Sequence, residues 1–237
     1  MKVKNFLCLG SVLLSSIAFT GCIKDTPIEP PKPVSFVSLL NISFKAPPVE
    51  MLINNEKATA PINPGVYFTR YITMDPGMID VTFKKAGSDS LVASLPPGDY
   101  YDSSSFYTLL LYDNPGGGSL ATRIKDEFPL TDNTKTFIRF FQLSADVPQV
   151  DLQIENTKVY TNRTPADNAA NSFYNEFQAY TPGNYSLKAK VAGTDSVIAS
   201  TTYSELAAGG IYTIFLKGIP GGTGASAYGI EVLRAAN

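Results

Sequence analysis

Histidine and tryptophan are absent from the chain, and cysteine occurs only at Cys8 and Cys22. Without histidine, neither a Ser-His-Asp nor a Cys-His catalytic arrangement can form, and imidazole zinc sites are excluded. The sequence G-x-x-x-x-G-K-[ST] does not occur, so a phosphate-binding loop is not expected. The net charge of −2 gives no basic surface for nucleic acid. These absences predict a protein that is not an enzyme, holds no cofactor or metal and binds no nucleic acid.

The N-terminus has the features of a signal peptide. Lys2 and Lys4 precede an apolar run from Phe6 to Phe19, which covers roughly 21 Å as a helix and is too short for the ~30 Å membrane core. The run ends in Phe19-Thr20-Gly21-Cys22, which resembles the lipobox of bacterial lipoproteins. We therefore predict cleavage after residue 21 and acylation of Cys22, which anchors the chain to a membrane. An ordinary secretory signal with a chance cysteine is the alternative.

The segment 22–33 follows as a tether. Ile23 to Pro33 contains four prolines and should be extended, so that it spaces the folded part from the bilayer. Lys24-Asp25 partly resembles the basic-then-acidic signal that exports lipoproteins of Bacteroidota to the outer cell face, although an ordinary charged tether has the same composition. The expected location is the bacterial cell envelope, on the periplasmic or cell-surface face of the outer membrane.

The rest of the chain contains an internal repeat. Four segments of the first half recur in the second with offsets of 101, 106, 106 and 105 residues. They begin at Pro47 (PPVEMLINNEK), Pro76 (PG), Val81 (VTFKKAGSDSLVAS) and Phe106 (FYTLLL). Alternation of apolar residues, as in Val49, Met51, Ile53 and in Val150, Leu152, Ile154, predicts half-buried strands. The shared AG[ST]DS predicts a hairpin in which Gly87 and Gly193 take positive φ, and Asp89 and Asp195 bond the turn backbone.

The segment from Ala166 to Tyr180 allows two interpretations. Phe173 and Phe177 are four residues apart, as on a helix, but Phe173, Phe177 and Ala179 also share one face of a strand. Its counterpart, Tyr67 to Met74, is rich in aromatic and β-branched residues. On this comparison the segment is predicted to be a strand.

Short strands with turn signals every 8 to 12 residues predict an all-β fold of two tandem immunoglobulin-like β-sandwich domains. The predicted organisation is a lipoprotein signal peptide at 1–21, the Pro-rich tether at 22–33, repeat 1 at 34–128 and repeat 2 at 129–237. The order of these motifs resembles domain of unknown function 4397, which occurs in tandem in envelope lipoproteins of Bacteroidota. The resemblance covers roughly residues 34–235 and implies a β-sandwich and an envelope location, but no activity.

Carboxylates leave two further chemistries to consider. Glycoside hydrolysis needs two close carboxylates, but Glu50 and Asp151 fall on strands of separate repeats and are expected on the solvated surface. A calcium ion needs clustered oxygen ligands, for which Asp99, Asp102 and Asp113-Asn114 come nearest. Neither chemistry is predicted.

One loop breaks the repeat. Between Pro96 and Ser105, copy one has Asp99-Tyr100-Tyr101-Asp102 where copy two has the small-residue turn 207–210. Adjacent residues of an extended segment point to opposite sides, so at least one tyrosine should offer its ring to solvent. These four residues are the candidate binding site; the alternative is that Tyr100 packs under the loop and Tyr101 caps the sheet edge. Ser90 and Ser196, in Asp-Ser-apolar sequences similar to the O-glycosylation sequon of Bacteroidota, are candidate modification sites.

The sequence therefore predicts a non-catalytic envelope lipoprotein that serves adhesion or binds a glycan or an envelope protein. The alternative is a structural or assembly lipoprotein whose domains act as spacers in an envelope complex. An exposed aromatic groove favours the first function, and a flat apolar patch or an unpaired edge strand favours the second.

Overall fold

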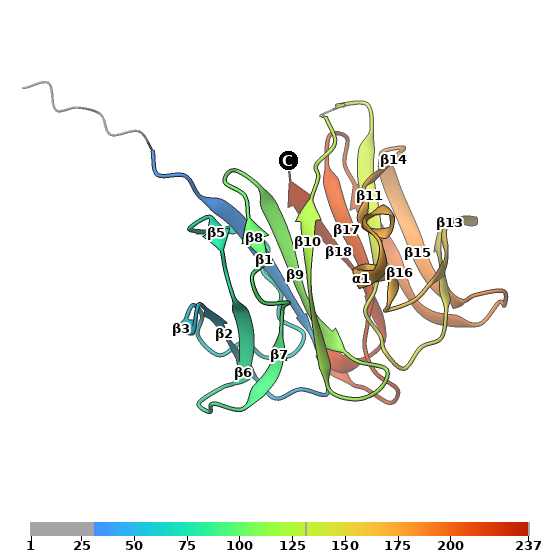
Figure 1. Cartoon of the computed structure of the whole chain (residues 1–237). Helices are drawn as coiled ribbons and strands as arrows, with labels where there is room; N and C mark the ends of the chain where they lie inside the picture. Colours follow the sequence, from blue (N-terminus) through green and yellow to red (C-terminus); the bar gives the residue numbers. More distant parts are fainter. Residues whose placement is uncertain (1–30, 131, 237) are drawn as a thin grey trace, which may run out of the picture. The chain divides into compact units, whose positions relative to one another are not determined.

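Strands make up most of the regular structure in the computed structural model, which describes residues 31–130 and 132–236 (Figure 1). Contacts divide the chain into Met1–Lys32 and Pro33–Asn237, and every described strand belongs to the second unit. The predicted signal peptide, Cys22 and most of the tether lie outside the described residues. Within the described part, no helix has the length and apolar character to cross a membrane.

The first half contains two four-stranded sheets and a small two-stranded one. The sheets have the orders β10-β9-β1-β4, β3-β2-β6-β7 and β5-β8. Within the first sheet β1 runs parallel to β9, while the other pairs are antiparallel. The strands are β1 (Ser35–Ile42), β2 (Val49–Ile53), β3 (Glu56–Lys57), β4 (Ile72–Met74), β5 (Gly77–Met78), β6 (Val81–Lys85), β7 (Leu91–Ser94), β8 (Tyr100–Tyr101), β9 (Phe106–Asp113) and β10 (Ser119–Asp126).

The second half repeats this arrangement with the orders β18-β17-β11-β14 and β13-β12-β15-β16, and β11 runs parallel to β17. The prediction of an all-β fold is confirmed. The strands are β11 (Thr136–Gln142), β12 (Val150–Ile154), β13 (Thr157–Arg163), β14 (Gln178–Tyr180), β15 (Gly183–Val191), β16 (Val197–Leu206), β17 (Ile211–Lys217) and β18 (Gly229–Ala236). Two short 3-10 helices, η1 (Ser172–Asn175) and η2 (Gly224–Ser226), and one α-helix, α1 (Asp167–Ala170), complete the described elements.

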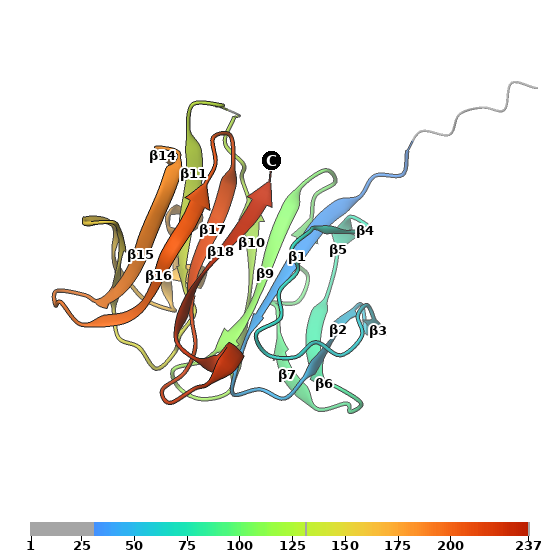
Figure 2. The ribbon, with the colours of Figure 1, turned by 180° about the vertical axis from the view of Figure 1, so that it is seen from behind.

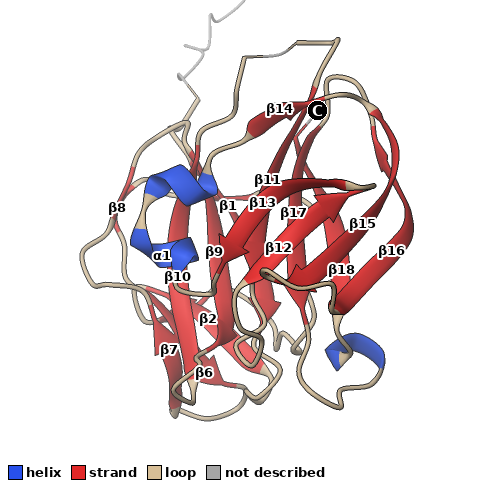
Figure 3. Cartoon of the chain, turned by 90° about the vertical axis from the view of Figure 1, so that its right-hand side faces the viewer, coloured by secondary structure: helices blue, strands red, loops and turns tan. Residues whose placement is uncertain are grey.

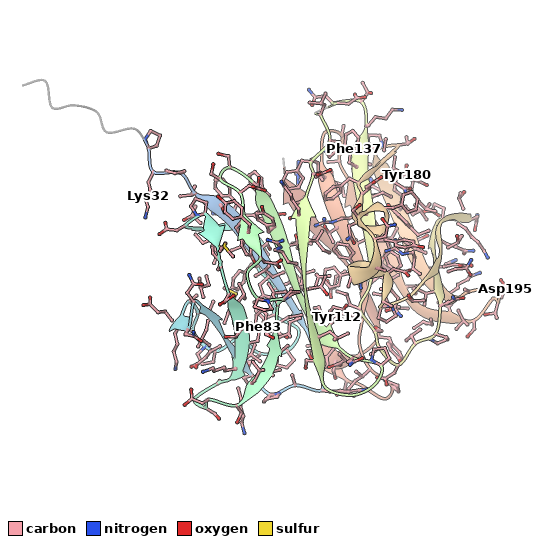
Figure 4. All side chains as sticks on the ribbon, viewed as in Figure 1. Lys32, Phe83, Tyr112, Phe137, Tyr180 and Asp195 are labelled. Atoms are coloured by element: carbon pink, nitrogen blue, oxygen red, sulfur yellow. The ribbon has the colours of Figure 1, made fainter. Side chains whose placement is uncertain are left out.

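Each half has its own apolar core between its two larger sheets. The predicted core face is confirmed: Val49 and Met51 are buried, Ile53 packs against them half-buried, and the matching residues of β12 are fully buried. The predicted exposure of the opposite face is wrong, because Glu50, Leu52 and Asp151 are buried as well. Phe83 on β6 belongs to the first core (Figure 4). The alternation therefore identified the core face of both strands.

The AG[ST]DS hairpins form as predicted, but with different hydrogen bonds. Gly87 and Gly193 have φ of 70° and 74°, the left-handed region that glycine enters without a steric penalty. The turn backbone is held by the hydroxyls of Ser88 and Thr194, which accept from the N–H groups two residues on. The expectation that Asp89 and its counterpart bond the turn is wrong. Each binds a strand lysine instead, at 3.1 Å.

A third apolar cluster joins the two halves. The strand β9 is buried on both sides: Leu109 and Leu111 face the first core, while Leu110 and Tyr112 face residues of β11 and β17. This explains why β9 reads as a continuous apolar run rather than an alternating one. We call this cluster the junction; its buried members are Leu40, Ile42, Leu110, Tyr112, Ile124, Phe141, Leu143 and Phe215. In Figures 1 and 2 the sheets that contain β9 and β17 lie next to each other, and Figure 4 labels Tyr112 between them.

The prediction of a strand over 166–180 is wrong for most of its length. Residues 167–170 form α1, residues 172–175 form η1, and only Gln178–Tyr180 pairs as β14. The carboxylate of Asp167 accepts hydrogen bonds from the N–H and hydroxyl of Thr164 at the helix start, which stabilises a turn there. Phe173 is 60% exposed and does not share a strand face with Phe177. These local hydrogen bonds, together with the cap of η1 by Asn171, whose Oδ1 accepts from Phe173 N–H at 2.9 Å, override the strand propensity inferred from the first repeat.

Candidate functional site

The two tyrosines of the predicted site lie on β8 and face opposite sides. Pairing with β5 places Tyr100 across from Met78 and Tyr101 across from Gly77. Tyr100 is 59% exposed, whereas Tyr101 is fully buried. The expectation that one ring is offered to solvent is therefore confirmed, and the exposed ring is that of Tyr100.

Tyr101 anchors the strand from beneath. Its ring lies edge-on to Tyr107, with 4.8 Å between the centroids, and the guanidinium of Arg123 lies 4.7 Å from its centroid. Burial is the main cause that raises the pKa of the Tyr101 hydroxyl above its ordinary value. Tyr101 is thus a packing residue, and it fixes the orientation of its neighbour on β8.

The two aspartates that flank the tyrosines are ion-paired. Asp99 Oδ1 lies 3.2 Å from Arg123 Nη2, and Asp102 Oδ2 lies 2.9 Å from Lys125 Nζ. Hydrogen bonds from Lys125 and from the Tyr107 hydroxyl lower the pKa of Asp102. Arg123 Nη1 also donates to the carbonyl oxygen of Tyr100 at 2.7 Å. Both carboxylates therefore hold the loop against β10.

Met78 is a surface residue that the sequence did not single out. It is 70% exposed, and a Cβ added at Gly98 would come within 3.4 Å of its terminal methyl. Met78 and Tyr100 together form what we call the Tyr100–Met78 patch. Met78 also lines a groove of about 490 Å³, together with Ile53, Asn54, Pro76 and neighbouring residues. A thioether and a phenol ring are thus exposed at paired positions of two short strands, β5 and β8.

The remaining candidate residues are dispersed. Ser90 and Ser196 are both exposed at the tips of equivalent hairpins, and O-glycosylation there stays a prediction. Asp113 is buried, and its Oδ1 accepts from the Ser43 hydroxyl and from Lys45 N–H, so it supports a turn. Within residues 31–130 and 132–236, no three acidic or other metal-ligating side chains are close enough to hold a metal ion.

The expectation that Glu50 and Asp151 are solvated is wrong. Both are largely buried, and each has a lysine partner: Lys57 at 2.8 Å from Glu50 and Lys158 at 2.6 Å from Asp151. The lysine comes seven residues after the carboxylate in both repeats and covers it from the neighbouring strand. These pairs therefore belong to the architecture of the repeat.

Fold and surface together define the class: an all-β protein with facing sheets, in which an aromatic and a thioether side chain are exposed at paired positions of β5 and β8. The model of a family described as Domain of unknown function (DUF4397) matches residues 35–153, half of the chain. The chain therefore belongs to this family. The match includes all of β1 to β11 and reaches into β12, so it extends across the junction into the second repeat. No curated protein matches the chain.

Proposed function

We propose that this protein is a non-catalytic lipoprotein of the bacterial cell envelope that binds a glycan or a protein through the Tyr100–Met78 patch. The lipobox-like sequence that ends at Cys22 supports an anchor in the outer membrane. The anchor and the Pro-rich segment behind it would hold the patch at a distance from the lipid surface.

The single observation that carries this function is the exposure of Tyr100 on a rigid support. Exposed tyrosine rings stack on sugars and anchor protein interfaces, and methionine adapts to varied apolar surfaces. Buried Tyr101 and the hydrogen bond from Arg123 to the Tyr100 carbonyl fix the backbone beneath the ring. Such pre-organisation reduces the entropy lost on binding.

We further infer that each repeat is an immunoglobulin-like sandwich. Two four-stranded sheets enclose one core in each half, and the strand orders correspond. The parallel pairing of the first strand with the penultimate one occurs in both repeats. Adhesive and receptor modules commonly use this architecture, although fold alone does not fix function.

A binding screen of residues 34–237 against glycans and envelope proteins tests the proposal. Tyr100→Ala should lower the affinity for a ligand found in this screen by at least about tenfold, as expected for the loss of an aromatic anchor. Phe173→Ala is the matched control, because Phe173 is equally exposed but belongs to η1 in the second repeat. Unchanged binding by Tyr100→Ala would reject the patch as the binding surface.

The second candidate function is that of a rigid spacer, and the junction favours it. The sheets that meet there bury a continuous apolar cluster and an ion pair between Arg139 and Asp126. A flexible pair of modules would instead bend at a polar linker. The test is to delete the gene and then express the Tyr100→Ala variant in the deletion strain. If this variant restores assembly of the envelope complex, the spacer function is favoured over the binding module.

A further inference from the structure

The groove that Met78 lines opens onto the core of the first repeat. Its volume of about 490 Å³ is within the ~300–1,000 Å³ typical of ligand-binding clefts. Half-buried Ile53 and buried Ile79 belong both to the core and to the lining of the groove. The apolar part of the lining is Ile53, Ala58, Pro76, Met78 and Ile79, and the polar part is Asn54, Glu56, Lys57 and Asp75. A ligand in the groove would therefore contact the end of the core directly.

Two tyrosines complete the core at the corresponding end of the second repeat. Tyr180 ends β14 and Tyr185 lies near the start of β15, two strands that are labelled in Figure 3. Their ring centroids are 5.5 Å apart, and both rings pack against the core. The Tyr185 hydroxyl donates to the carbonyl oxygen of Thr181 at 3.0 Å. Ile154, the equivalent of half-buried Ile53, is completely buried.

The pairing of strands shows that the two places correspond. Met74 pairs with the first residue of β1, and Tyr180 pairs with the first residue of β11. Ile79 and Tyr185 each come two residues before the partner of the last residue of β2 or β12. Met74 and Ile79 therefore stand where the second repeat has its two tyrosines. Both side chains are smaller and lack a ring, which leaves the groove open at this end of the first repeat.

The ring of Tyr101 does not replace the missing tyrosines. Tyr101 pairs with Gly77 as Leu206 pairs with the equivalent glycine, so it adds a ring to the first repeat. That ring packs against Tyr107 of β9 and Arg123 of β10. The strand β10 forms one edge of its sheet, and β4, which carries Met74, forms the other. Tyr101 accordingly is not part of the lining of the groove.

We propose that this groove binds the side chain of a tyrosine from a protein ligand. The ring takes the place that Tyr185 has in the second repeat, with its hydroxyl directed to the backbone carbonyl of Asp75, the equivalent of the Thr181 acceptor. Exposed Tyr100 stands across from Met78, so both side chains can contact the flanking residues of the same ligand. This inference rests on the function proposed for the Tyr100–Met78 patch, and it selects a protein rather than a glycan as the ligand.

Titration of the ¹³C-methyl-labelled full chain tests the groove. The probes are acetyl-Gly-Tyr-Gly-amide, acetyl-Gly-Ala-Gly-amide and methyl β-glucoside. The tyrosine peptide should shift the methyl resonances of Ile53, Ala58 and Met78 with a Kd on the order of 1 mM, as expected for a small fragment. The alanine peptide and the glucoside should leave them in place. No shift with the tyrosine peptide, equal shifts with the alanine peptide, or shifts with the glucoside alone would each overturn the proposal.

The variant Ala58→Phe blocks the groove from its rim, because Ala58 is exposed and lines it. This variant should lower the affinity for the tyrosine peptide at least about tenfold, as expected when an aromatic anchor loses its pocket. Ala60→Phe is the matched control, because Ala60 is also exposed but is not part of the lining. Equal affinity of the two variants would place the peptide outside the groove and reject the proposal.

The variant Tyr185→Ile removes the ring that fills the equivalent place in the second repeat. It should create a second site, seen as a shift of the Ile154 methyl resonances that the tyrosine peptide does not cause in the wild type. A folded Tyr185→Ile protein without this shift would show that loss of the ring does not make a tyrosine site, against the proposal. The patch is tested separately by the binding screen. A screen ligand that depends on Tyr100, together with no response to the tyrosine peptide, would reject the groove and leave the patch as the binding surface.

Discussion

Arg139 Nη1 lies 2.6 Å from Asp126 Oδ1, and both side chains are almost completely buried at the junction between the repeats. Thr108 and Tyr71 donate to Asp126 Oδ2, each at 2.7 Å, while Arg139 Nε donates to Thr213. Burial and the charge of Asp126 raise the pKa of Tyr71, so it remains a donor. The first repeat contributes the carboxylate and the second the guanidinium. The two repeats therefore contribute different side chains to their interface, although their folds are similar.

Removal of one partner of this pair should be costly. Arg139→Met leaves the buried carboxylate without its counterion, and a loss of about 3–5 kcal/mol in the free energy of unfolding is expected. Urea denaturation followed by circular dichroism measures it. The surface pair Lys84–Asp89 is the control, because Asp89 is fully exposed and Asp89→Ala should leave the stability nearly unchanged.

The double variant Arg139→Met/Asp126→Leu separates charge from packing. It removes both charges, so it should be less destabilised than the sum of its single variants, with a coupling of about 0.5–3 kcal/mol. Full recovery is not expected, because the hydroxyls of Thr108, Thr213 and Tyr71 lose their partners. Strict additivity would show that the two residues contribute independently.

The tyrosines of β8 should respond to substitution in opposite ways. Tyr100→Ala removes an exposed ring and should change the free energy of unfolding by no more than about 0.5 kcal/mol. Tyr101→Ala removes a ring packed against Tyr107 and Arg123 and should cost about 3–5 kcal/mol. Thermal melts of the two variants compare them directly. Similar destabilisation of both would mean that Tyr100 also has a structural role.

The strands of the repeat were predictable from sequence because local and tertiary signals agree there. Alternation placed Val49 and Val150 in their cores, and glycine identified the hairpins at Gly87 and Gly193. The α1–η1 segment was missed because its counterpart in the first repeat contains a strand. A signal was present: the offset between copies rises from 101 to 106, which places five extra residues between Lys158 and Pro182.

The junction depends on contacts that the sequence does not encode locally. Arg139 occupies the position that Ser38 has in the first repeat. A single charged residue in an apolar strand indicates that a buried partner exists, but it does not identify which residue that partner is. Asp126 comes from the other repeat. Their partners are set by how two sheets pack, so only the structure brings them together.

Lipidation of Cys22 remains a prediction because this residue lies outside the described part of the chain. Metabolic labelling with a fatty-acid analogue should mark the wild type and not Cys22→Ser. Cys8→Ser is the matched control, because Cys8 is expected to leave with the signal peptide and its loss should not change the label. Equal labelling of the wild type and Cys22→Ser would contradict the predicted anchor.

Asp151 should make the stability of the second repeat depend on pH in the acidic range. Burial raises the pKa of its carboxyl, but hydrogen bonds from Lys158 Nζ at 2.6 Å and from Asn162 N–H at 3.0 Å outweigh this effect, and the pKa lies below its ordinary value. A carboxyl whose pKa is lower in the folded state stabilises the protein above its unfolded pKa of ~3.9, and this contribution disappears as the pH falls through the folded value. At pH 7, Asp151→Asn should therefore be less stable than the wild type by roughly 1 kcal/mol, since the partner lysine is partly exposed. The difference should shrink steadily below about pH 4. Urea denaturation of both proteins at a series of pH values measures it, and a difference that stays constant from neutral to acidic pH would show that the ion pair with Lys158 does not stabilise the fold.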